Sequence, residues 1–154
     1  MKFVEEYIDF ENSIGPWLGK TSKIVDYYLH ELLLEQGLDL SKEQMITLKK
    51  LHDKDGLNQN ELAFLTFRDK SSLARLLSKM EKKNYIQRKQ SKTDRRINEV
   101  FLTSKGRAVF KQSKPAIKRF MTIMEQNITA EERKHMIKIF KKIQFNFTQE
   151  KAAL

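Results

Sequence analysis

Residues 70–82 constrain the fold more than any other part of this sequence. Four apolar side chains in this stretch, Leu73, Leu76, Leu77 and Met80, recur at the i, i+3, i+4 and i+7 spacing of one helix face. The opposite face is polar and cationic and contains Ser71, Arg75, Ser78, Lys79 and Lys82. The pattern predicts a short helix from about Lys70 to Lys82 that buries one face and exposes a cationic one.

A second short helix is predicted directly before this one. Asn58 is a preferred helix N-cap, and Glu61, Leu62 and Leu65 fit the turns that follow it. Two short helices joined by a tight turn are typical of a helix-turn-helix, whose second helix enters the major groove of duplex DNA.

A charged hairpin is predicted next. Asn84 is placed to end the preceding helix in the left-handed conformation, and strands begin at about Ile86 and Ile97. The polar segment between the strands is strongly cationic and contains Lys89, Lys92, Arg95 and Arg96. Such a loop could reach the minor groove, where narrow A·T-rich stretches attract arginine, or it could be a solvated turn.

Long helices are predicted on both sides of this centre. Residues 13–36 form an amphipathic pattern that Gly37 can end, and Ser41 with Gln44 reads as a capping box for a helix over residues 42–54. After the hairpin, Thr103 can cap a long helix that contains Pro115, and a second capping box at Thr129 and Glu132 can begin the last helix.

The flanking helices carry more apolar surface than a monomer readily hides. The residues concerned are Trp17, Tyr28, Phe120, Met124, Phe140, Ile143 and Phe147. We expect some of them to pack inside the chain and the rest to form a homodimer interface. The predicted fold is mainly α with a small β-hairpin wing. Residues 1–154 form one domain, with a winged helix-turn-helix over 38–104 and dimerisation helices over 1–37 and 105–154.

The net charge of +10 favours an anionic partner, and the charge is unevenly distributed. Residues 68–96 contain 11 Lys and Arg against three Asp and Glu, whereas residues 1–67 contain seven against 12. A solvated lysine-rich face is the alternative explanation. On the predicted second helix, Lys70 is a further candidate DNA contact, and Ser71 and Ser72 can donate to phosphate or to base edges. Lys79 and Lys82 are expected to contact phosphate. Arg75 can read guanine, or it can pair with a phosphate or a carboxylate.

Several classes of protein do not fit this composition. The chain has no cysteine, which removes disulfides and thiol-based sensing, and it has no phosphate-binding glycine loop or nucleophile elbow. Residues 1–6 do not resemble a leader sequence, and no apolar run is long enough to span a membrane. We therefore expect a cytoplasmic protein with no membrane association, no cofactor and no enzymatic activity.

Three other functions remain open at this stage. RNA binding would favour exposed aromatic side chains, but residues 68–96 offer only Tyr85, which is expected to pack. A winged helix that binds protein would leave the concentration of arginine unexplained. A metal-responsive regulator would need clustered ligands, yet His30, His52 and His135 are isolated in the sequence.

The run KSSLARLLSKMEKKNYIQRKQSKTDRRINEVFLTSKG, residues 70–106, resembles the central signature of the MarR family of bacterial repressors. Its most specific part is Asp94-Arg95-Arg96 followed by Leu102-Thr103 and Gly106. Two positions depart from the family pattern: Asn84 stands where glycine is usual, and Ala74 stands where a β-branched or hydroxyl residue is common.

The resemblance implies a homodimer with intertwined terminal helices that binds a pseudo-palindromic operator in double-stranded DNA. It also implies that Asp94 pairs with an arginine to brace the wing, and that Arg96 probes the minor groove. Relatives commonly release DNA when a small aromatic effector binds near the dimerisation helices. Trp17, Tyr28, His30 and Met45 are candidates to line such a pocket, although core packing is the commoner role for such side chains.

Overall fold

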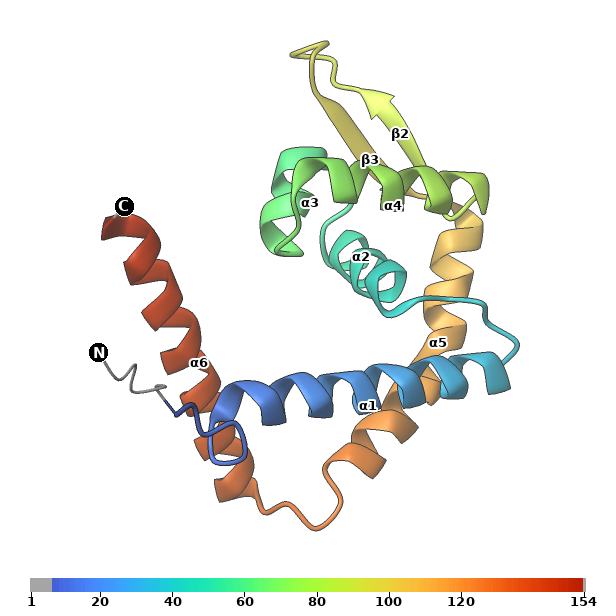
Figure 1. Ribbon diagram of the computed structural model, residues 1–154. Helices are drawn as coiled ribbons and strands as arrows, with labels where there is room; N and C mark the ends of the chain where they lie inside the picture. The colour runs from blue at the N-terminus through green and yellow to red at the C-terminus, as the bar shows by residue number, and fades with distance from the viewer. Residues whose placement is uncertain (1–6, 154) are drawn as a thin grey trace. The chain divides into compact units, whose positions relative to one another are not determined.

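The computed structural model describes residues 7–153, and the chain divides into two compact units, Met1–Phe120 and Met121–Leu154 (Figure 1). The first six residues, on which the expectation of no leader sequence rests, lie outside the described residues. The elements are α1 (Ile14–Glu35), α2 (Lys42–Asp53), β1 (Leu57–Asn58), α3 (Gln59–Leu65), α4 (Lys70–Lys82), β2 (Ile86–Gln90), β3 (Asn98–Leu102), α5 (Ser104–Met124) and α6 (Ala130–Ala153). The mainly helical fold with a small wing is therefore confirmed.

Local hydrogen bonds set the starts of α2 and α3. At α2 the Ser41 hydroxyl accepts the Gln44 N–H at 3.2 Å, and the Gln44 side chain accepts the Ser41 N–H at 3.4 Å. At α3 Asn58 and Glu61 make the same reciprocal pair at 2.8 and 2.9 Å. Both helices begin where the sequence predicts, because each capping pair satisfies two N–H groups that lack a partner within the helix.

Helix α1 ends at a glycine, as predicted. Gly37 has a φ of 72°, a conformation that costs glycine little. The N–H of Leu38 donates to the carbonyl of Leu33 at 3.0 Å, and the N–H of Gly37 donates to Leu34 at 2.8 Å. These two bonds form a Schellman motif, which satisfies the last carbonyls of α1 and leads the chain toward α2.

The wing belongs to a three-stranded antiparallel sheet with the order β1-β3-β2. Strands β2 and β3 form the predicted hairpin, with Ile86 opposite Leu102 and Gln90 opposite Asn98. Strand β1 is an addition to the prediction, and it pairs Leu57 with Val100. A strand of two residues is too short to produce a pattern in the sequence, so only its pairing with β3 reveals it.

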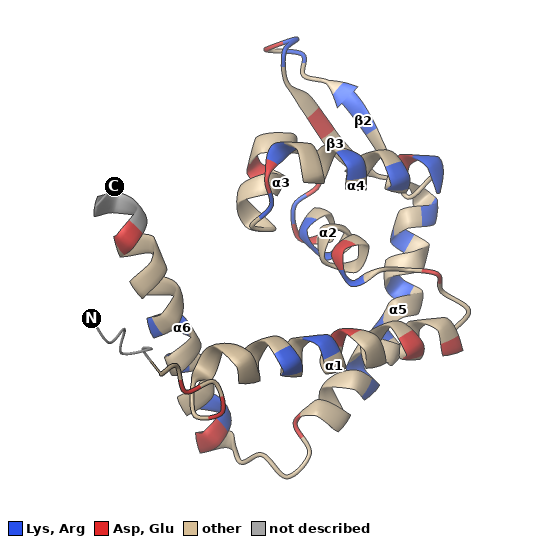
Figure 2. Ribbon diagram, in the orientation of Figure 1, with Lys and Arg blue, Asp and Glu red and all other residues tan. Residues whose placement is uncertain are grey.

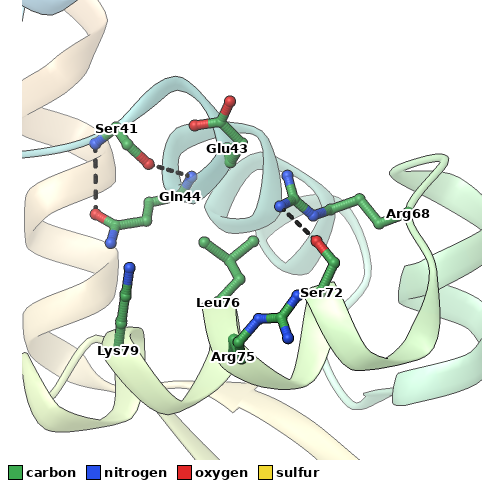
Figure 3. Close-up of a pocket in the computed structure, with 8 residues that line it drawn as sticks. All are labelled: Ser41, Glu43, Gln44, Arg68, Ser72, Arg75, Leu76 and Lys79. Atoms are coloured by element: carbon green, nitrogen blue, oxygen red, sulfur yellow. Dashed lines mark hydrogen bonds between the residues drawn. The ribbon is translucent and has the colours of Figure 1, made fainter.

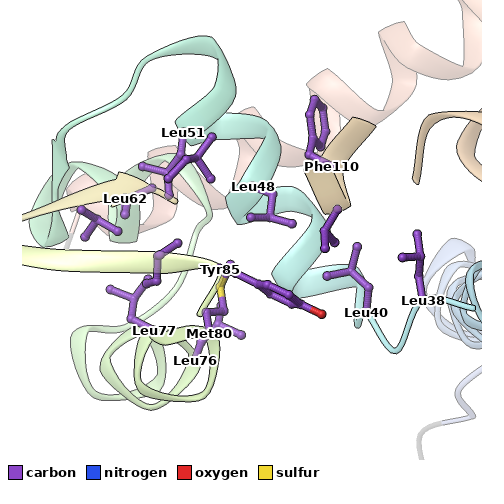
Figure 4. Close-up of a cluster of buried hydrophobic side chains, with 14 of the residues drawn as sticks. Leu38, Leu40, Leu48, Leu51, Leu62, Leu76, Leu77, Met80, Tyr85 and Phe110 are labelled. Carbon is purple, nitrogen blue, oxygen red and sulfur yellow. The ribbon is translucent and has the colours of Figure 1, made fainter. Parts of the chain in front are cut away.

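The apolar stripe of α4 lies in the core of the first unit. Leu73, Leu76, Leu77 and Met80 are all buried, as predicted. Figure 4 shows the last three of these side chains in one cluster with side chains of α2 and α3. The core fixes α4 by one face and leaves the cationic face toward solvent.

The junction between α4 and α5 is unusually close. The Thr103 hydroxyl donates to the carbonyl of Asn84 at 2.6 Å and accepts the Gly106 N–H at 2.9 Å, so it caps α5 as predicted. Asn84 has a φ of 60°, the left-handed conformation expected of it. A Cβ atom at Gly106 would lie 2.0 Å from the carbonyl oxygen of Tyr85, so this position requires glycine.

Many large apolar side chains of the flanking helices are exposed. On α1, Trp17 and Tyr28 are exposed, whereas Phe120 near the end of α5 packs partly against the core. In the second unit, Thr129 and Glu132 form the predicted capping box. None of residues 130–150 is buried, and Phe147 is 71% exposed.

Candidate nucleic-acid interface

The start of α4 is organised by its N-cap, Asp69. One carboxylate oxygen accepts the Ser72 N–H and the Ser71 hydroxyl, both at 2.8 Å. These hydrogen bonds lower the pKa of the Asp69 carboxyl, and the bond from the Ser72 N–H has the largest effect. The Ser71 proton is therefore engaged within the chain. The Ser72 hydroxyl accepts a bond from Arg68 and keeps its own proton for another acceptor.

Six cationic side chains on α4 and in the wing loop are exposed and form no salt bridge or hydrogen bond within residues 7–153. They are Lys70, Arg75, Lys79, Lys82, Lys92 and Arg95. Figure 2 shows basic residues along α4, in β2 and at the tip of the wing. Because no carboxylate of the described chain forms a salt bridge with these side chains, they can bind an external anion such as a phosphodiester.

The wing loop holds Arg96 through Asp94. The guanidinium Nε and Nη2 of Arg96 donate to the two oxygens of Asp94, each at 3.2 Å, and the Arg96 N–H donates to the same carboxylate at 3.0 Å. This pairing, implied by the family resemblance, lowers the pKa of the Asp94 carboxyl. The Arg96 side chain remains 89% exposed, and most of its N–H donors are still free.

A groove of about 410 Å³ lies between the first turn of α2 and α4. Figure 3 shows its lining residues, which are Ser41, Glu43, Gln44, Arg68, Ser72, Arg75, Leu76 and Lys79. Arg68 donates to the Ser72 hydroxyl at 2.8 Å, and its buried Nε has no hydrogen-bond partner among the residues that the structure describes. With Glu43 as its acidic member, the groove is cationic overall and suited to an anion.

Sequence reasoning missed Arg68. It precedes α4 in the turn between the two short helices, so no helical periodicity assigns it to a face. The available signal was its place as the first cation of the dense basic stretch over residues 68–96. The structure brings Arg68 beside Arg75 and Lys79, two residues that the sequence did assign to the interface.

The four candidate effector residues do not line this groove. Trp17, Tyr28 and His30 are exposed on α1, so the expectation that they pack in the core does not hold for the single chain. Met45 is partly buried against the core from α2.

Residues 7–153 include no helix that is both long enough and apolar enough to cross a bilayer. In the same described part of the chain, no three carboxylate or imidazole side chains gather closely enough to hold a metal ion.

Known proteins share both the sequence pattern and the fold of this surface. The MarR family model matches residues 40–97. The uncharacterized HTH-type transcriptional regulator YdgJ of Bacillus subtilis (strain 168) is 32% identical over 110 residues. This match covers 71% of the chain and 66% of YdgJ, just under two thirds of that relative.

The fold is shared with solved structures as well. The transcriptional repressor CouR, bound to a 23-mer DNA duplex, aligns over 90% of this chain and 99% of its own with a TM-score of 0.79 and 20% identity. BpsR of Bordetella bronchiseptica, whose DNA binding is regulated by 6-hydroxynicotinic acid, aligns over 90% and 98% with a TM-score of 0.82 and 16% identity. At these identities the likeness concerns the fold alone.

The family model spans α2, α3, α4, β2 and the wing loop, and so includes α4 and the wing loop, which carry the exposed cationic side chains. The family and the curated relatives are transcriptional regulators, not enzymes. Both findings agree with the signature seen in residues 70–106, and the chain belongs to the MarR family of winged helix-turn-helix transcriptional regulators.

Proposed function

We propose that this protein represses transcription by binding, as a homodimer, a pseudo-palindromic operator in double-stranded DNA. One observation carries the proposal. Helix α4 buries its whole apolar stripe and keeps Arg75 and Lys79 exposed, with no salt bridge or hydrogen bond to the described chain. A helix held in this way can enter the major groove, which is about wide enough for one helix.

The contacts differ in what they supply. Arg75 reads a base edge, and Lys79 and Arg68 bind a phosphate at the groove between α2 and α4. Lys70 and Ser72 bind DNA phosphates near the start of α4, where the helix dipole also favours an anion, whereas Ser71 can donate to a phosphate only by giving up its bond to Asp69. In the wing, Arg96 enters the minor groove under the control of Asp94, with Lys92 and Arg95 beside it on the phosphates.

Dimerisation is supported by the exposed apolar side chains of α1 and α6. Trp17, Tyr28 and Phe147 expose more than half of their surface, and a second copy is the occupant that a pseudo-palindromic site requires. Two recognition helices must lie about 34 Å apart to read successive major grooves. The terminal helices then act as the spacer.

We further propose that a small aromatic effector releases the operator. BpsR supports this step by analogy, since 6-hydroxynicotinic acid regulates its DNA binding. Such a ligand shifts the population toward a spacing of the two helices that does not fit DNA, and its effect is limited by its differential affinity for the two states. Trp17, Tyr28, His30 and Met45 are the candidate contacts. Adding 6-hydroxynicotinic acid to the complex tests whether DNA affinity falls.

The central test begins with the wild-type protein and sheared genomic DNA. Bound fragments are sequenced, and affinity for the selected duplex is compared with that for a shuffled duplex at several salt concentrations. Lack of preference for any duplex at low salt would refute the proposal.

The role of Arg75 is tested on the selected duplex. Arg75→Ala is expected to cost about 1 to 3 kcal/mol of binding free energy and to relax one base position. Lys111→Ala, which removes an exposed cation of α5, is the matched control and is expected to bind as the wild type does. Equal losses on the selected and shuffled duplexes would instead make Arg75 a phosphate contact.

A further inference from the structure

We propose that Glu81 is a positioning residue, which fixes the angle of the wing relative to α4 through Arg88. The inference rests on the DNA-binding function proposed above. It concerns how two separate DNA contacts, one from the helix and one from the wing, are kept in register.

The contacts between Glu81 and Arg88 tie the last turn of α4 to the first strand of the wing. One oxygen of Glu81 accepts the backbone N–H and the side-chain Nε of Arg88, both at 3.2 Å, and the other accepts Nη2 at 3.1 Å. The same Nη2 lies 3.3 Å from the hydroxyl of Ser78, one turn earlier on α4. A single carboxylate thus holds both the main chain and the side chain of the strand.

The place of Arg88 in the sheet explains why this matters. Strand β2 is an edge strand, since the order is β1-β3-β2, and an edge leaves some backbone N–H groups without a strand partner. The N–H of Arg88 is one of these, and Glu81 satisfies it. The wing is therefore attached to α4 by a hydrogen bond that the sheet itself does not use.

A small change in the tilt of the wing at its base produces a large displacement at its tip. At roughly 3.4 Å per residue, the five residues of β2 span about 17 Å, so a tilt of about 10° displaces the loop by about 3 Å. A hydrogen bond does not survive a displacement of that size. The position of Arg96 at the tip consequently depends on the angle that Glu81 sets.

The side chain of Arg88 is bonded within the chain, whereas that of Arg75 forms no salt bridge or hydrogen bond within residues 7–153. Its guanidinium is bonded to Glu81 and Ser78, and it holds the pKa of the Glu81 carboxyl below the ordinary value. Both side chains are partly exposed, and pairs of this kind add little to folding stability. Removing Glu81 should therefore leave the fold intact.

The test replaces Glu81. Loss of its carboxylate should tighten DNA binding if only net charge matters, and should weaken DNA binding if Glu81 positions the wing. Glu81→Ala frees a cation and raises the net charge by one, which by simple electrostatics should tighten DNA binding. Under the positioning proposal the variant binds the selected duplex about fivefold more weakly, although its melting temperature and dimer content match the wild type. Glu81→Gln keeps one oxygen for the Arg88 N–H and should lie between the two.

The decisive measurement is a double-mutant cycle with Arg96. We expect Arg96→Ala to weaken binding about tenfold or more in the wild type but less than about threefold in Glu81→Ala. In the Glu81→Ala protein the wing is already displaced, so Arg96 contributes less to DNA binding. A purely structural ion pair would leave the cost of Arg96→Ala the same in both backgrounds.

The control is Glu125→Ala, which also frees an arginine, Arg133, and changes the net charge equally. If Glu81→Ala behaves as Glu125→Ala does, and the two costs of Arg96→Ala agree, the positioning role is overturned while the proposed function stands. If the wild type prefers no duplex at all, both proposals fall.

Discussion

Helices α4 and α6 carry similar side chains but bury them very differently. Both mix lysine with large apolar residues. In the 13 residues of α4 all four residues of the apolar stripe are buried, whereas in α6, a helix of 24 residues, none of residues 130–150 is buried. An amphipathic pattern therefore specifies which face must be covered but not what covers it. Helix α4 finds its cover within the chain, and we propose that α6 finds it in a second copy.

The contrast also separates two kinds of function. A helix held by the core on one side presents its other face at a fixed place, as DNA reading requires. A helix with an uncovered apolar face is suited to association. Substitutions on the two helices should accordingly differ in whether they change folding, association or DNA affinity.

The largest effect on stability is expected from a substitution on the buried face of α4. Leu77 is completely buried, so Leu77→Ala should lower the free energy of unfolding by about 3 kcal/mol through reduced burial and the cavity left behind. Urea denaturation measures this change. Leu65→Ala, at a position that is 44% exposed, should cost less than about 1 kcal/mol. Similar costs at the two sites would contradict the burial pattern.

The next largest effect is expected at Gly106, where the first turn of α5 packs against the backbone of Tyr85. Gly106→Ala should destabilise the fold by about 2 kcal/mol, because the new methyl group meets the Tyr85 carbonyl and one backbone must shift. Gly19→Ala on α1 is the matched control. A Cβ there meets nothing within 4 Å, so this variant should raise stability by about 0.5 to 1 kcal/mol. The two glycine variants should thus shift the thermal midpoint in opposite directions.

A smaller effect is expected from a substitution on α6, and it should change the affinity of the dimer. If a second copy covers this face, Phe140→Ala should raise the dimer dissociation constant about tenfold. Sedimentation equilibrium measures it, with the adjacent Lys141→Ala as the control. A wild-type protein that remains monomeric at high concentration would remove the proposed role of α6.

The smallest effect is electrostatic. Lys79→Ala should reduce the slope of log affinity against log salt concentration by about 0.9 for each phosphate that the protein no longer neutralises, and affinity should fall similarly on all duplexes. Fluorescence anisotropy across a salt series measures the slope. Lys111→Ala should leave it unchanged. A weakening confined to one sequence would show that Lys79 reads a base.

The cationic face could be predicted because it follows from one helix. Leu73, Leu76, Leu77 and Met80 are buried as their spacing requires, and Arg75 is consequently exposed. Arg68 and strand β1 escaped prediction. A turn residue has no periodicity, and a strand of two residues exists only where a partner strand lies beside it.

The sequence alone determined the features that arise from neighbours along the chain. Capping pairs such as Ser41 with Gln44 lie three residues apart, and the left-handed turn at Asn84 depends on one residue, so each is encoded where it occurs. Tertiary structure decided the contacts between separate elements. The carboxylate of Asp55 bonds to the Leu102 N–H, 47 residues away, and Arg88 reaches Glu81 across the junction of helix and wing. Such pairs form only because packing of the core brings the elements together, and no local pattern in the sequence specifies which side chains then meet.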